Sequence, residues 1–99
     1  MIIERVAVLT AIVDNPKAVQ EEFNRIIAEY QSLVIGRMGL PLADKGISII
    51  CITLCGNMNA INSLNGRLGK LEAVHSKLTV SKKEFIEKDT QKDVEKSEK

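Results

Sequence analysis

Aromatic residues are scarce in this sequence: they make up 3% of its 99 residues, and tryptophan is absent. Domains that bind single-stranded nucleic acid stack the bases on exposed aromatic side chains, and this chain offers only Phe23, Tyr30 and Phe85. Its net charge of +1 gives no strong attraction toward phosphate polymers or acidic membranes. We therefore expect no direct nucleic-acid partner, no membrane partner, and a core built from aliphatic side chains.

Long uncharged apolar runs and cysteines are also few. The amino-terminal stretch MIIERVAVLTAIV is divided by Glu4 and Arg5, which makes it too short and too charged for a signal peptide or a membrane-spanning helix. Cys51 and Cys55 are the only cysteines. Because no export signal is recognised, free thiols and a cytoplasmic location are expected.

Residues with reaction chemistry are too few to form a recognisable active site. His75 is the single histidine, no serine or cysteine triad is apparent, and no phosphate loop of the Walker or dinucleotide type occurs. Cys51 and Cys55 are separated by about 13 Å along an expected strand, which is too far for a disulfide within one chain. We expect no enzyme activity, no cofactor and no metal. A metal- or redox-responsive site built from both cysteines and His75 is the alternative.

The apolar pattern predicts four strands and two helices. Apolar or alternating runs indicate strands over residues 4–14, 32–40, 47–55 and 73–81. A helix is expected from Pro16, since one apolar stripe is formed by Val19, Phe23, Ile26, Ile27 and Tyr30. A second helix is expected after Gly56-Asn57, with its inner stripe formed by Ala60, Ile61, Leu64, Leu68 and Leu71.

The resulting order, β-α-β-β-α-β, predicts an α+β fold in which a four-stranded antiparallel sheet carries both helices on one face. The first and third strands are the most apolar and should be central, whereas the second and fourth should be edges. We expect one domain over residues 1–82. Residues 83–99 are dense in lysine and acidic residues and are expected to form a charged, flexible tail, or alternatively an arm that binds a partner.

The two central strands are apolar on both sides, although helices cover only one face of the sheet. The third strand presents two apolar sets, which are Ile50, Ile52 and Leu54 on one side and Ile49, Cys51 and Cys55 on the other. The residues alone do not assign either set to the helices. Either way, six to eight apolar side chains stay uncovered, on the order of 500 Å², near the upper limit for a soluble monomer. We therefore expect a homo-oligomer, either a dimer or a tetramer.

The segment VIGRMGLPLADKG, residues 34–46, raises the question of a binding loop. Arg37 lies between glycines and should point to the face opposite Met38. A guanidinium beside open backbone N–H groups suits a carboxylate or a phosphate. The alternative is an edge-strand arginine between glycines that twist the edge away from unwanted pairing. The candidate ligand-binding residues are Gly36, Arg37, Met38, Gly39 and Pro41.

Two longer stretches resemble a known family. LVIGRMGLPLADKGISIICITLCG together with INSLNGRLGKLEAV resembles the small proposed regulators of the iron-only hydrogenase system, and the similarity extends from about Arg5 to Val80. That family is similar in fold to ACT domains and to the C-terminal domain of the nickel-responsive repressor. The resemblance implies a ferredoxin-like, ACT-like βαββαβ oligomer with a regulatory role.

Three departures limit what this resemblance implies. The nickel repressor binds metal through several histidines and a cysteine, whereas this chain has one histidine. No segment before Glu4 could form the repressor's DNA-binding ribbon-helix-helix. ACT domains that bind amino acids commonly carry Asp-x-Pro-Gly after the first strand, and here Lys17 replaces that glycine and removes a close backbone approach. A nickel site, direct DNA binding and a standard amino-acid site are therefore not expected.

Taken together, these features predict a small non-catalytic regulatory or ligand-sensing domain that acts as a homo-oligomer. A small anionic ligand would bind at a subunit interface near Arg37 and change the packing of the oligomer. The alternative is a protein–protein adaptor for hydrogenase maturation, which would bind its protein partner through the oligomer rim and the charged tail.

Overall fold

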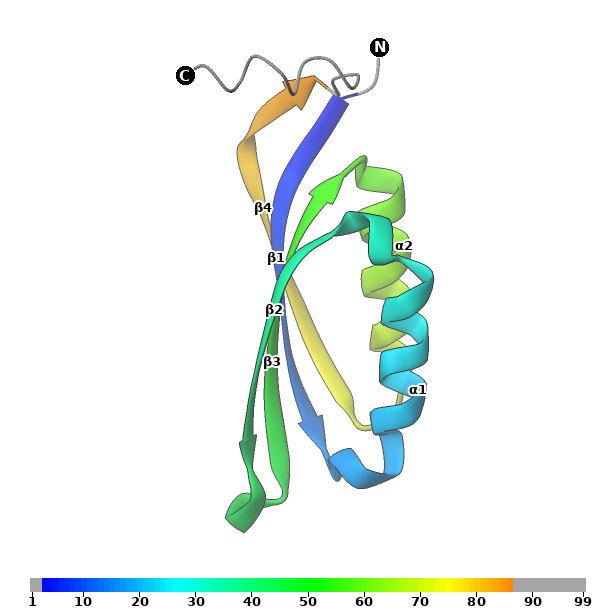
Figure 1. Ribbon diagram of the computed structural model, residues 1–99, viewed down its shortest axis with the longest axis vertical. Helices are drawn as coiled ribbons and strands as arrows, with labels where there is room; N and C mark the ends of the chain where they lie inside the picture. The colour runs from blue at the N-terminus through cyan, green and yellow to red at the C-terminus, as the bar shows by residue number, and fades with distance from the viewer. Residues whose placement is uncertain (1–2, 87–99) are drawn as a thin grey trace.

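The computed structural model describes residues 3–86 and confirms the predicted α+β fold (Figure 1). Its strands and helices are β1 (Ile3–Asp14), α1 (Pro16–Glu29), β2 (Val34–Leu42), β3 (Ile47–Gly56), α2 (Met58–Gly69) and β4 (Val74–Ile86). Two short 3-10 turns, η1 (Gln31–Leu33) and η2 (Ala43–Lys45), precede β2 and β3. Across residues 3–86 no helix is long and apolar enough to cross a membrane.

The four strands form one antiparallel sheet in the order β2-β3-β1-β4, which is the ferredoxin-like arrangement. As predicted, β1 and β3 are central and β2 and β4 are edges. Helices α1 and α2 lie next to each other on one face of the sheet (Figure 1). No helix or strand of residues 3–86 covers the opposite face, which we call the open face.

The core lies between the helices and one face of the sheet, and strand alternation decides which side chains enter it. The buried side chains of β1 are Ala7, Leu9, Ala11 and Val13. The helices contribute Phe23, Ile26, Ile27, Ile61, Leu64 and Leu68. On β3 the helix side takes Ile50, Ile52 and Leu54, which resolves the assignment that the sequence left open. Full burial of one such aliphatic side chain contributes about 1.5–3 kcal/mol.

The last strand continues beyond Ser81, so the predicted end of this strand was wrong. β4 extends to Ile86, and its final residues pair with the beginning of β1, with Glu84 opposite Arg5. The guanidinium of Arg5 donates hydrogen bonds to Glu84 Oε2 at 2.6 Å and to the Ser81 carbonyl at 3.3 Å. Backbone pairing and this ion pair extend the strand, although its last residues, Phe85 and Ile86, are exposed. Residues 87–99 of the predicted tail lie outside the described part of the chain.

Polar contacts join the two helices on their outer side. Glu29 at the end of α1 forms ion pairs with Arg67 of α2 and, at 3.1 Å, with Arg25. Tyr30 shares a hydrogen bond of 2.8 Å with Ser63 of α2. The hydrogen bond from Arg67 and the nearby positive charges lower the pKa of Glu29 below the ordinary carboxyl value. The groups are exposed, so each pair contributes little to stability.

The interior position of Leu64 gives a first prediction. Leu64 is fully buried on α2, so Leu64→Ala should lower the free energy of unfolding by about 2–5 kcal/mol through lost burial and a residual cavity. Asn62→Ala, at an exposed position of the same helix, is the control and should change it by less than about 0.5 kcal/mol. Urea denaturation monitored by circular dichroism measures both, and equal effects would contradict the assigned core.

The Glu29 ion pairs give a pH-dependent prediction. Because folding lowers the pKa of Glu29, its stabilising effect is present above the unfolded-state value, near pH 4. The effect is lost as the pH falls through the lower folded-state value. Glu29→Gln should therefore reduce the urea midpoint at pH 7, and this deficit should shrink as the pH is lowered to 2.5. Glu21→Gln, at an exposed position of the same helix, is the control. A Glu29→Gln deficit that persists unchanged at pH 2.5 would contradict the assigned ion pairs.

Candidate functional site

A cleft of about 280 Å³ opens between α1 and the edge strand β2, on the helix side of the sheet. Its apolar lining consists of Val13, Pro16, Phe23, Pro41 and Ile50. Its polar lining consists of Gln20, Asn24, Arg37 and Ser48, and Gly39 completes the wall. Pockets for drug-sized molecules occupy about 300–1,000 Å³, so this cleft has the size for a small metabolite.

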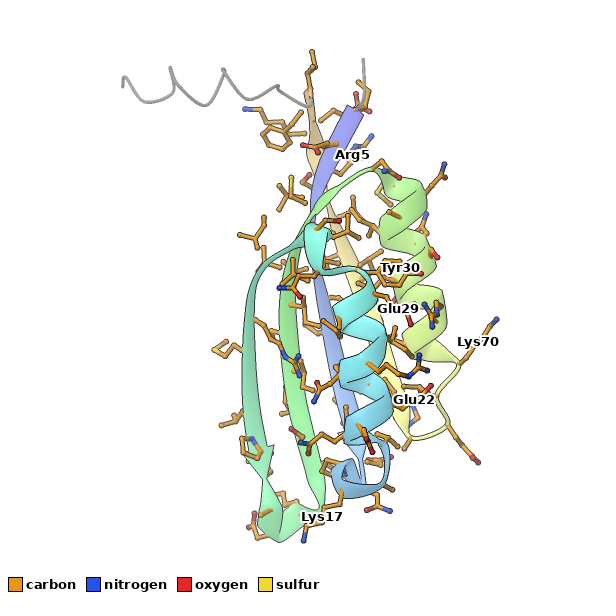
Figure 2. All side chains as sticks on the ribbon, turned by 45° about the vertical axis from the view of Figure 1, so that its right-hand side comes forward. Arg5, Lys17, Glu22, Glu29, Tyr30 and Lys70 are labelled. Carbon is orange, nitrogen blue, oxygen red and sulfur yellow. The ribbon has the colours of Figure 1, made fainter. Side chains whose placement is uncertain are left out.

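Local backbone structure fixes the beginning of α1 at one end of the cleft. Asn15 adopts a left-handed conformation with φ 52° between β1 and α1, which asparagine tolerates better than most residues. Its backbone N–H donates to the Gly46 carbonyl at 3.0 Å, which ties the beginning of α1 to the β2–β3 connection. Lys17 lies beside this connection (Figure 2). The first turn of α1 is thereby fixed opposite the end of β2.

Gly39 enlarges the cleft because it has no side chain. A Cβ atom built at this position would meet no other atom within 4 Å. It would therefore enter the open space of the cleft instead of the packed core. The glycine makes the middle of β2 a site where a ligand can approach the backbone closely.

Arg37 is the positively charged residue of the cleft. Its Nη2 group donates a hydrogen bond of 2.7 Å to Asn24 Oδ1 on α1. Its guanidinium also lies over the Phe23 ring, 5.8 Å from the centroid, a geometry that is typical of a cation–π contact. Within residues 3–86 no carboxylate lies at ion-pair distance from Arg37. The partners seen there are neutral and leave the positive charge uncompensated.

The five sequence-predicted site residues divide between the two faces of β2. Arg37, Gly39 and Pro41 line the cleft. Met38 lies on the open face opposite Cys51, as expected from strand alternation. Gly36 pairs with Thr53 and shares the face of Met38. The five residues therefore do not form a single site.

Sequence reasoning missed the contribution of α1 to this cleft. Phe23 was assigned to the core stripe, and Asn24 was given no role, although both contact Arg37. The sequence signal for Asn24 was weak: Asn24 directly follows Phe23 of the apolar stripe, where the buried side of α1 meets its exposed side. A contact across 13 positions of sequence depends on how α1 lies on the sheet.

The open face carries the apolar side chains that were expected to remain uncovered. Met38 is 66% exposed and Leu40 55%, both on β2, and on β1 Ile12 is 46% and Val8 38% exposed. Half-buried Cys51 lies between these strands on β3. Leu40, Ile49 and Ile12 lie side by side across β2, β3 and β1. Thr10 and Thr53 share this face and lie beside Val8.

The cysteines and the histidine do not converge on a site. Across residues 3–86 no group of three or more His, Cys, Asp or Glu side chains is placed to hold a metal ion. The Cys55 thiol donates to Glu4 Oε1 at 3.7 Å, and burial together with the Glu4 charge raises its pKa. This thiol therefore stays protonated at neutral pH and is a poor nucleophile. His75 Nε2 lies 3.5 Å from Asp14 Oδ2 at the far edge of the sheet.

Solved structures with this fold support the architecture. The uncharacterized protein TM1266 from Thermotoga maritima aligns with a TM-score of 0.76 and 24% identity, over 80% of this chain and 99% of that one. A protein described as a "putative PII-like signaling protein" from Thermus thermophilus aligns with a TM-score of 0.51 and 9% identity, over 82% of this chain and 91% of that one. No curated protein matches the sequence. At these identities the structural likeness shows the fold.

The family is shown by a direct match to the sequence. The TM1266-like family model, described as "Iron-only hydrogenase system regulator, putative", matches residues 5–78. The matched range contains every residue that lines the cleft and all the exposed apolar residues of the open face named above. This chain belongs to the TM1266-like family of proposed iron-only hydrogenase system regulators.

Proposed function

We propose that this protein is a non-catalytic regulatory domain that binds a small anion in the Arg37 cleft and acts as a homo-oligomer. One observation carries the proposal: a guanidinium lines a concave site in which its partners are neutral. Arginine recognises carboxylates and phosphates through paired N–H donors. The contact with Asn24 occupies Nη2 and orients the group, while donors on the other guanidinium nitrogens remain for a ligand.

The lining of the cleft favours binding over reaction. Its polar side chains are Gln20, Asn24, Arg37 and Ser48, and none of these is a general acid or base near neutral pH. A serine nucleophile needs an adjacent base, and the single histidine lies at the far edge of the sheet. The family description as a hydrogenase system regulator agrees with a non-catalytic role.

Strand β2 connects the cleft to the open face. Arg37 and Gly39 face the cleft. The alternating residues Met38 and Leu40 face the open side of the sheet. As an edge strand, β2 is paired only with β3. A ligand that moved β2 toward α1 would displace its apolar side chains on the open face by the same shift. The ligand regulates the oligomer only if it binds one packing more tightly than another.

The open face is the proposed oligomer contact. Four large apolar side chains with exposed fractions of 38–66% occupy it, and patches of this kind mark interaction surfaces. A second copy of the chain offers a patch of the same chemistry, so two open faces can cover each other. Burial of apolar surface then drives association.

The anion site is tested with Arg37→Gln. In wild type, acetate, benzoate or inorganic phosphate at ten times its Kd should raise the thermal midpoint by about 6–11 °C, since the complex is stabilised by about 1.4 kcal/mol. Arg37→Gln should lose this shift for every anion that produces it. The control is Arg25→Gln, an exposed arginine of α1 that already pairs with Glu22 and Glu29. Equal shifts in wild type and Arg37→Gln, or no shift in wild type, would contradict the site.

The oligomer is tested with Ile12→Lys. A lysine at this position of β1 on the open face would have to be desolvated in a face-to-face contact, so the variant should be monomeric at micromolar concentration. Light scattering coupled to gel filtration measures the mass. Glu21→Lys, on the exposed surface of α1, is the control and should keep the mass of wild type. A monomeric wild type would contradict the proposal directly.

A further inference from the structure

The charges around the cleft restrict which anion fits. One lining residue, Arg37, is cationic and none is acidic. The neighbouring charged residues Lys17 and Glu21 line a separate hollow on the outer side of Gln20 and Asn24. A ligand with one negative charge is therefore matched, and a second charge of either sign on the ligand finds no charged partner of its own among the lining side chains.

An α-amino acid is disfavoured for this reason. Its ammonium group lies close to its carboxylate, so a carboxylate bound to Arg37 would bring the ammonium near the guanidinium. The amide oxygen of Asn24, a neutral acceptor close to Arg37, already accepts a hydrogen bond from it at 2.7 Å. Like charges at short distance repel, and an unpaired charge in a partly enclosed site is costly.

The apolar part of the lining defines the rest of the ligand. Pro16 and Pro41 face the cleft from α1 and β2, and Val13 and Ile50 line it from the central strands. These rigid or branched side chains suit an aliphatic or aromatic body. The open space at Gly39 gives that body room beside the strand. At about 280 Å³ the cleft has room for a small ligand of this kind.

We propose that the ligand is a monocarboxylate with an apolar body and no amino group; this inference rests on the proposed anion site. Its carboxylate binds the guanidinium of Arg37 and the amide of Asn24. Its aliphatic or aromatic body lies against Pro16, Pro41, Val13 and Ile50, next to Gly39.

Pairs of ligands that differ only by the ammonium group test this proposal. Titration calorimetry on the full chain compares 3-phenylpropionate with L-phenylalanine and 4-methylpentanoate with L-leucine, with inorganic phosphate as a further probe. At least one acid should bind about tenfold or more tightly than its amino acid and than phosphate. Arg37→Gln should lose this binding and Arg25→Gln should keep it.

Gly39→Val provides a second, independent readout. A Cβ atom at this position meets no other atom within 4 Å, and a β-branched residue suits a strand, so the fold should be kept. It should weaken 3-phenylpropionate binding by about tenfold but leave acetate binding nearly unchanged. Equal weakening of both, or of neither, would overturn the assignment of the ligand's body to the cleft.

The failures of the two proposals are distinguishable. If an amino acid or phosphate binds as tightly as the acids, and Arg37→Gln abolishes that binding, the monocarboxylate inference is wrong and the anion site stands. If no probe binds in an Arg37-dependent way, both proposals are wrong.

Discussion

The structure depends on the packing of two helices against one face of a sheet whose central strands are apolar on both faces. Leu9 and Ile52, paired across β1 and β3, lie fully buried beneath the helices. The same alternation sends Val8 and Ile12 to the other side, where no element of residues 3–86 covers them. The two helices of residues 3–86 cover one side of the sheet. The open face therefore follows directly from how this core is built, and it is the surface to which we assign the proposed association.

Strand β2 contributes side chains to both of the surfaces for which we propose a function. Its helix side lies beyond the tight packing under the helices, so Arg37, Gly39 and Pro41 line a cleft instead of a core. Its other side presents Met38 and Leu40. As an edge strand, β2 is hydrogen-bonded to β3 alone. A register shift between Val34 and Gly36 interrupts this pairing. The proposed anion site and the proposed oligomer contact thus share one short strand.

Most of the fold could be predicted from the sequence because apolar periodicity fixes strands and helices locally. The central places of β1 and β3 followed from their composition. The end of β4 did not, because Lys82, Lys83 and Glu84 resemble the start of a solvated tail, whereas backbone pairing with β1 does not require buried side chains. Of the residues that line the cleft, the sequence singled out Arg37, Gly39 and Pro41. The contacts of Phe23 and Asn24 with Arg37 depend on the placement of α1 on the sheet. Tertiary packing of this kind leaves no local pattern.

The contact between Tyr30 and Ser63 has a spectroscopic consequence. Tyr30 is the chain's single tyrosine, and there is no tryptophan, so ultraviolet emission from the protein arises from one phenol. That phenol lies where the end of α1 meets α2 and hydrogen-bonds to Ser63 at 2.8 Å. Intrinsic fluorescence of the unlabelled protein therefore reports on the junction of the two helices. Separation of the helices can be followed optically without adding a dye.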